Sequence, residues 1–144
     1  MTTKAINKAT IRLVEARLFQ YPIDKRLVDA WERESRAIAG DLPSSAAHLG
    51  EILKGSGLHS DPTFSKVIRL ERMANQVDEA RWYVRAIDDV MELLSQQERE
   101  LIEKRYFKKE TDTKICQDLH LSHNKYYKLK RTILMKFARR MGFL

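Results

Sequence analysis

The side chains best suited to chemistry in this chain follow one another directly after Ser122. From there the sequence reads SHNKYYKLKRTILMKFARRMG, in which apolar residues recur every three or four positions and predict an amphipathic helix. The opposite face then carries amide, imidazole, phenol and cationic groups, which hydrogen-bond base edges and phosphates in a DNA groove. The side chains that we predict to bind duplex DNA are His123, Asn124, Lys125, Tyr127, Lys128, Lys130 and Arg131.

Each side-chain type indicates the contact that it can make. The amide of Asn124 can pair bidentately with adenine, and Lys128 and Arg131 can contact guanine or phosphate. The Tyr127 hydroxyl suits a phosphate oxygen. A charged helix end is often only a solvated surface, and that interpretation is the alternative for this segment.

The positive charge of the chain is confined to its last third. Residues 101–144 contain 12 Lys/Arg against 4 Asp/Glu, a net charge of +8. The whole chain of 144 residues carries +7, so the remainder is close to neutral at −1. A neutral body with one basic end is typical of a polyanion-binding protein, and it favours nucleic acid over a membrane surface.

The sequence offers no evident catalytic or metal chemistry. Cys116 is the single cysteine and cannot form an internal disulfide. Together with His120 and His123 it provides three ligands, whereas a structural zinc normally takes four. No apolar run approaches a membrane span of about 18 residues, and no signal peptide is recognisable. We therefore expect a cytoplasmic, non-enzymatic protein without metal, cofactor or membrane partner.

Local capping signals divide the C-terminal part into three short helices. The SQQE sequence at Ser95 is a capping box that begins the first helix, and Thr111 can cap the second. A turn at His120 leads to Ser122, which caps the basic helix. This succession predicts a helix-turn-helix, in which the last helix enters the major groove. The predicted DNA-binding domain spans residues 95–144.

The remaining residues, 1–94, predict an N-terminal helical body. Two helices are expected on either side of Tyr21-Pro22, because a residue that precedes proline avoids the α region. Residues 41–61 are rich in Gly and Ser and predict a mobile loop. A long helix is then expected over 62–94. The fold class predicted for the whole chain is all-α.

The long helix carries an uninterrupted heptad pattern over four repeats. Such a pattern lets one helix face a partner continuously, either within a bundle of the same chain or across a homodimer. Both alternatives fit the sequence. The predicted seam consists of Leu70, Met73, Val77, Ala80, Val84, Ile87, Met91 and Leu94.

The C-terminal part resembles region 4 of sigma-70-type factors. There, an acidic and arginine-rich helix ending in an aromatic residue precedes an EIA…LGIS turn and a basic recognition helix. Residues 114–116 stand for the EIA element and residues 119–122 for LGIS, with His120 where glycine is common. The resemblance implies contacts with RNA polymerase and places Lys125 and Arg131 toward the DNA backbone. It places the base-reading positions on His123, Asn124, Tyr127 and Lys128.

Over most of its length the chain is also similar to the phage and prophage late-transcription regulators of Gram-positive bacteria, the ArpU and RinA type. Those proteins share an early Tyr-Pro, here at 21–22, and a Ser-Asp-Pro-Thr start to a long helix, here at 60–63. The resemblance implies control of phage late genes, including packaging and lysis. It also implies a bacterial host cell as the site of action.

The leading hypothesis is a sequence-specific DNA-binding regulator, an activator, whose partner is double-stranded DNA. Because the rest of a sigma factor is absent, we do not expect the chain to open a promoter alone. One alternative is a module that docks on RNA polymerase or another phage protein. Another is a small DNA-packaging subunit of the terminase type.

Overall fold

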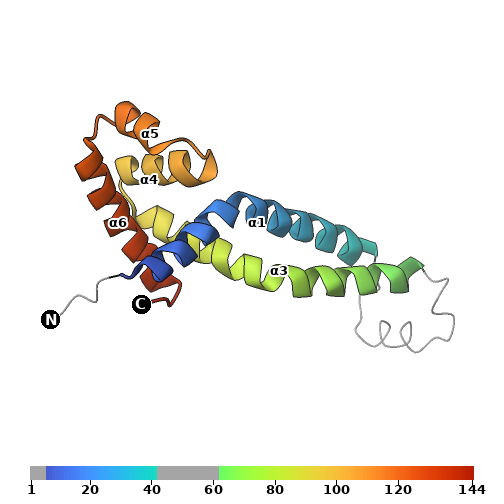
Figure 1. The fold of residues 1–144 in the computed structure, drawn as a ribbon. Coiled ribbons are helices and arrows are strands. Elements are labelled where there is room, and N and C mark those ends of the chain that lie inside the picture. Colours follow the sequence, from blue (N-terminus) through green and yellow to red (C-terminus); the bar gives the residue numbers. More distant parts are fainter. Residues whose placement is uncertain (1–5, 42–61) are drawn as a thin grey trace. The chain divides into compact units, whose positions relative to one another are not determined.

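A computed structural model describes residues 6–41 and 62–144, and this part of the chain is helical without a strand (Figure 1). The predicted all-α class is confirmed. None of the described helices is long and apolar enough to cross a membrane. Most of the predicted loop 41–61 lies outside the described residues. The elements are α1 (Lys8–Asp41), α3 (Pro62–Leu93), α4 (Gln96–Ile102), the π-helical segment η1 (Glu103–Phe107), α5 (Asp112–Asp118) and α6 (His123–Arg140).

Helix α1 runs through Pro22, so the predicted pair of N-terminal helices is corrected to one helix. Proline cannot donate the backbone hydrogen bond to the Leu18 carbonyl, and it disfavours the α region for Tyr21. Packing offsets that cost. Leu18 is fully buried, while the ring of Tyr21 stacks on Phe107 at 4.6 Å between centroids and its hydroxyl donates to Asp88. These long-range contacts hold the backbone helical where the local signal predicted a break.

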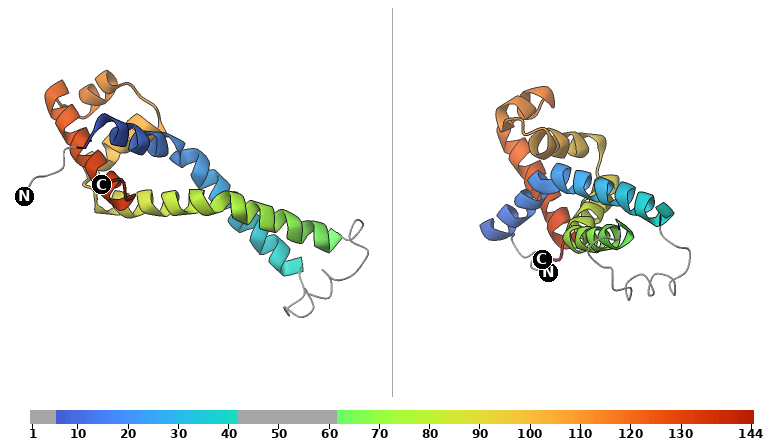
Figure 2. Two further views of the ribbon diagram at one scale, coloured as in Figure 1. Left: turned by 60° about the horizontal axis from the view of Figure 1, so that its bottom comes forward. Right: turned by 90° about the vertical axis from the view of Figure 1, so that its right-hand side faces the viewer.

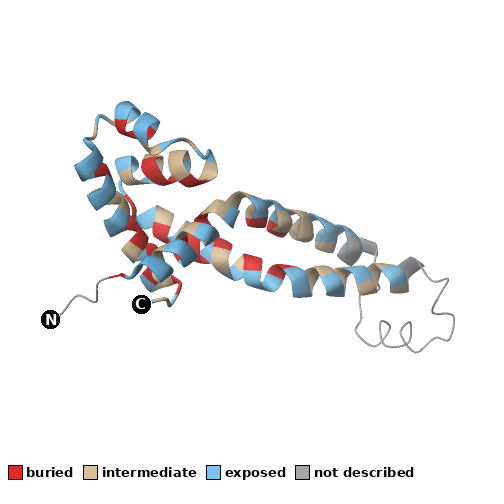
Figure 3. Cartoon of the chain, in the orientation of Figure 1, coloured by how far each residue is buried: buried red, intermediate tan, exposed pale blue. Residues whose placement is uncertain are grey.

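The described residues form two compact units. Residues up to 23 and from 82 onward make one, and residues from 24 to 81 make the other. The predicted boundary at 94/95 does not coincide with these units, because a single apolar core joins the first turns of α1, the end of α3 and the C-terminal helices (Figure 3). The largest fully buried side chains of this core include Leu18, Ile87, Leu101, Tyr106, Tyr126 and Phe137.

In the unit of residues 24–81, part of the heptad seam is covered within the chain. Val28, Val77 and Ala80 are buried, and the Arg81 guanidinium lies 4.7 Å from the centre of the Trp31 ring. This burial favours the bundle alternative, and a homodimer stays a prediction. Over the whole seam, Val77, Ala80, Val84, Ile87 and Leu94 are buried, while Leu70, Met73 and Met91 are half-buried.

The predicted capping box at the start of α4 is confirmed. The Glu98 N–H donates to Ser95 Oγ at 3.3 Å, and the Ser95 N–H donates to the Glu98 carboxylate at 3.0 Å. The hydrogen bond from the Ser95 backbone lowers the pKa of Glu98. The sequence did not predict the π-helical segment that follows, in which the Lys108 N–H donates to the Glu103 carbonyl at 2.9 Å.

Replacement of Pro22 by alanine should stabilise the protein. Alanine can donate the missing hydrogen bond, and proline inside a helix is about 3 kcal/mol less favourable than alanine. Since alanine also gives the unfolded chain more freedom, we expect the free energy of unfolding to rise by about 1–3 kcal/mol in urea titrations. Gln20→Ala, on the exposed side of the same helix, should change it by less than about 0.5 kcal/mol. A loss of stability in Pro22→Ala would contradict the account given for this position.

Candidate nucleic-acid interface

Helices α5 and α6 are joined by a tight turn whose capping groups are all present. The Lys114 N–H donates to Thr111 Oγ1, and the Lys125 N–H donates to Ser122 Oγ, each at 3.3 Å. His120 has a φ of 55°, a left-handed conformation that histidine tolerates better than most residues. Both predicted caps are therefore confirmed, and the turn forms with histidine in place of glycine.

The backbone hydrogen bonds identify this turn as a Schellman motif. The Leu121 N–H donates to the Cys116 carbonyl at 2.9 Å, and the His120 N–H donates to the Gln117 carbonyl at 3.3 Å. These two bonds satisfy carbonyls that the end of α5 would otherwise leave open. The direction in which α6 leaves α5 is thereby fixed by main-chain geometry.

Helix α6 has one buried face and one exposed polar face. Tyr126, Ile133 and Phe137 are fully buried, together with Leu134. Tyr127 is 48% exposed, which is unusual for a large aromatic side chain in a packed helix. Six of the seven predicted DNA-binding residues are exposed, namely His123, Asn124, Lys125, Tyr127, Lys128 and Arg131.

Lys130, the seventh predicted DNA-binding residue, does not lie on the exposed face. Only 16% of its side chain is exposed, and its Nζ lies 3.9 Å from the Glu15 carboxylate of α1. It also lies 5.7 Å and 5.4 Å from the ring centres of Tyr126 and Tyr127. Because Lys130 follows the buried Tyr126 by four residues, it shares the flank of the buried stripe and does not join the exposed face.

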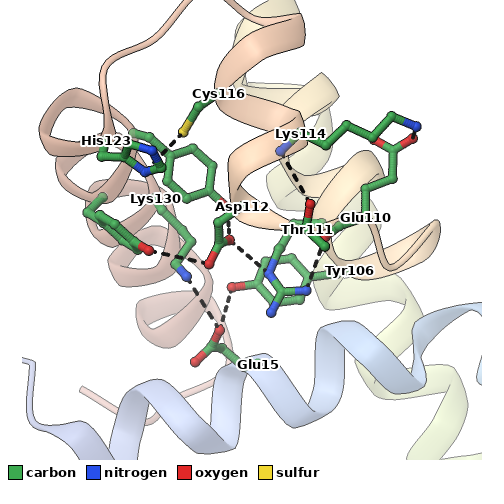
Figure 4. A network of polar contacts seen from close by, with 12 residues as sticks. Glu15, Tyr106, Glu110, Thr111, Asp112, Lys114, Cys116, His123 and Lys130 are labelled. Carbon is green, nitrogen blue, oxygen red and sulfur yellow. Dashed lines mark hydrogen bonds and ion pairs between the residues drawn. The ribbon is translucent and has the colours of Figure 1, made fainter.

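Asp112 connects α5 to the start of α6 and was not predicted from the sequence. Its carboxylate accepts hydrogen bonds from the hydroxyl of Tyr126 and, at 3.5 Å, from that of Tyr127 (Figure 4). Arg105 Nε lies 3.1 Å from the same carboxylate. Burial raises the pKa of Tyr126, and the bond to Asp112 acts in the same direction. An aspartate in the first turn of a helix is usually attributed to the helix dipole, so the sequence gave no signal of these partners.

Glu15 makes the corresponding connection from α1 and was also missed. The Tyr106 hydroxyl donates to it at 2.7 Å, and Lys130 approaches the same oxygen (Figure 4). Tyr106 is fully buried, and this burial raises the pKa of its phenol. A glutamate one residue after the buried Val14 was not distinguishable by pattern from a solvated one.

The cysteine and one histidine of the considered zinc set lie close together. Cys116 Sγ lies 3.9 Å from His123 Nδ1 (Figure 4). Cys116 is buried, and desolvation raises the pKa of its thiol, so the neutral form is favoured. Within the described ranges, no group of three or more His, Cys, Asp or Glu side chains could hold a metal ion.

Comparison with known proteins finds one informative relative. The chain is 26% identical to the transcriptional activator rinA of Staphylococcus phage phi11 over 145 aligned residues, which cover 99% of each chain. No family model matches the chain. No solved structure matches it either. The full-length similarity confirms the resemblance to the RinA type of phage regulator that the sequence predicted.

Asp112→Asn should destabilise the protein by about 1–2 kcal/mol. Asparagine keeps the shape of the side chain but loses the charge opposite Arg105 and one of the two acceptor oxygens. Urea unfolding measures the loss. Asp118→Asn is the matched control on the same helix, because its ion pair with Lys104 lies near the surface and should contribute little to the free energy of unfolding. Equal losses of unfolding free energy in both variants would show that Asp112 stabilises the protein no more than a surface aspartate does.

Stability should fall at alkaline pH because of the two buried phenols. Tyr106 and Tyr126 have pKa values raised above the ordinary 10.0, so they keep their protons in the folded state when the unfolded chain has lost them. Their stabilisation is complete below pH 10 and decreases above it, by up to about 1.4 kcal/mol per pH unit for each tyrosine.

Tyr106→Phe and Tyr126→Phe should each reduce the slope of the unfolding free energy against pH, because each variant releases about one proton fewer on unfolding. Urea titrations between pH 9 and 11 give the slope. Phenolate absorbance gives an independent reading, because Tyr106 and Tyr126 should ionise only when the chain unfolds. An unchanged slope in both variants would show that these phenols do not control alkaline stability.

Proposed function

We propose that this protein is a phage transcription regulator that binds duplex DNA through the exposed start of α6. One observation supports the proposal above all others. Six polar or cationic side chains between residues 123 and 131 are exposed on a helix whose opposite face is buried. Such a helix is held rigidly while its groove-facing side chains stay accessible.

The side chains divide by the contacts that they can make. Asn124 and Lys128 lie four residues apart on the outward face, where a recognition helix presents groups to base edges in the major groove. Lys125 and Arg131 flank this line and suit phosphates, which fix register but do not read sequence. Tyr127 already interacts with Asp112 at 3.5 Å, a distance that leaves its hydroxyl able to turn to a phosphate.

The relative and the family resemblance support a proposal for the sign and the targets of regulation. The phage phi11 protein is a transcriptional activator, and the resemblance to the ArpU and RinA type implies phage late genes. We therefore propose activation of late genes such as those for packaging and lysis. RNA polymerase is the partner through which an activator of this kind would act.

Asn124→Ala and Lys128→Ala should each weaken binding to the preferred DNA sequence by about 1–3 kcal/mol, with a smaller loss on random DNA. The preferred sequence is selected from DNA flanking the gene of this protein, and affinity is measured by fluorescence anisotropy at two salt concentrations. Lys136→Ala is the matched control, because that lysine lies on the same helix but pairs with Glu98 of α4 at 3.4 Å. It should bind like the parent.

The same titrations separate the alternatives. Equal losses on preferred and random DNA would make the two residues phosphate contacts. If the parent protein instead shows no sequence preference but retains RNA polymerase in a pull-down, that result would favour a protein-docking module over a sequence-specific DNA-binding protein. A large ring in solution would favour a packaging subunit, which mass photometry would detect.

A further inference from the structure

The first turns of α1 cross α6 beside its exposed polar face. Arg131 Nη2 lies 3.5 Å from the Ile6 carbonyl, and Lys130 Nζ lies 3.9 Å from the Glu15 carboxylate. These contacts fix both ends of the segment 6–15 against adjacent residues of one helix. The two ribbon views of Figure 2 agree that the start of α1 lies beside α6. Although α1 begins more than 100 residues away in sequence, it therefore borders the exposed face.

Two cations lie between those contacts, Lys8 and Arg12. They are separated from each other by four residues, and Arg12 precedes Glu15 by three, so all three share one side of α1. Glu15 shows that this side faces α6. Both cations are exposed, and neither forms an ion pair with a carboxylate of the described residues.

Two other cations of the same unit are neutralised by acidic side chains. Lys104 pairs with Asp118 at 3.3 Å, and Arg140 pairs with Asp89 at 3.0 Å. Asp118 and Asp89 therefore compensate charge away from the start of α6. The uncompensated positive charge beside α6 includes Lys8 and Arg12.

We infer that Lys8 and Arg12 bind backbone phosphates of the DNA next to the base pairs read by α6, an inference that rests on the proposed function. The contact between Arg131 and Ile6 places the segment on the flank of α6 that carries Tyr127 and Arg131. The added phosphate contacts therefore lie at one edge of the footprint. They strengthen binding without changing which sequence is preferred, because phosphates carry no base identity.

The double variant Lys8→Ala/Arg12→Ala tests the inference in the full-length chain. Each lost phosphate contact should weaken binding about tenfold at 0.1 M salt, equally on preferred and random DNA, and should lower the slope of log affinity against log salt by about 0.9. Ethylation interference should lose signals at one edge of the footprint and keep those at its centre. The matched control is Arg26→Ala/Arg33→Ala, which removes two exposed charges from the same helix. Circular dichroism verifies that both variants fold.

The possible outcomes distinguish failure of this inference from failure of the proposed function. A loss in the double variant that matches the control, or an unchanged salt slope, overturns the role of Lys8 and Arg12 while sequence preference in the parent protein still supports the proposed function. A parent protein that binds no DNA overturns both. A change of preferred sequence in the double variant also overturns the inference, because phosphate contacts cannot produce it.

Discussion

The buried phenols of Tyr106 and Tyr126 impose the constraint on which the C-terminal architecture depends. A hydroxyl that is buried without a partner costs about 1–3 kcal/mol, so each must find an acceptor in the interior. Tyr106 finds Glu15 on α1, and Tyr126 finds Asp112 on α5. Two different helices are thereby tied to the core beneath α6. Apolar packing alone would leave their register less specific, since it is not directional.

The same two carboxylates also determine which cations remain available. Asp112 lies against Arg105, and Glu15 lies against Lys130, so the charges nearest the core are compensated where water is scarce. Cations farther along the outward face do not have to be buried to fold the protein. Buried packing and exposed charge are thus divided between the two faces of one helix. This division explains why Lys130 differs from its neighbours in a segment of nearly continuous positive charge.

The sequence predicted those features that depend on neighbouring residues. The caps at Ser95 and Ser122 follow from bonds within three residues, and the exposed face of α6 follows from helical periodicity. The features it missed depend on residues far apart. Pro22 is tolerated because distant partners hold Tyr21, and Lys130 turns inward because Glu15 lies beside it, 115 positions earlier. Neither pairing leaves a local pattern, so residue type alone predicted a helix break and a DNA contact.

Among the C-terminal α-helices, α4 and α5 have an acidic residue in the first turn and α6 has none, as is also the case for α1 and α3. The first turns of α4 and α5 contain Glu98 and Asp112, which favourably oppose the partial positive charge at a helix N-terminus. The first turn of α6 contains no acidic residue and instead carries Lys125 beside exposed polar groups. Its end of the dipole therefore adds to the cationic side chains. For folding alone this arrangement is unfavourable by a few tenths of a kcal/mol or more. A bound phosphate would reverse the sign of that term, which is why the electrostatics of α6 support an anionic partner.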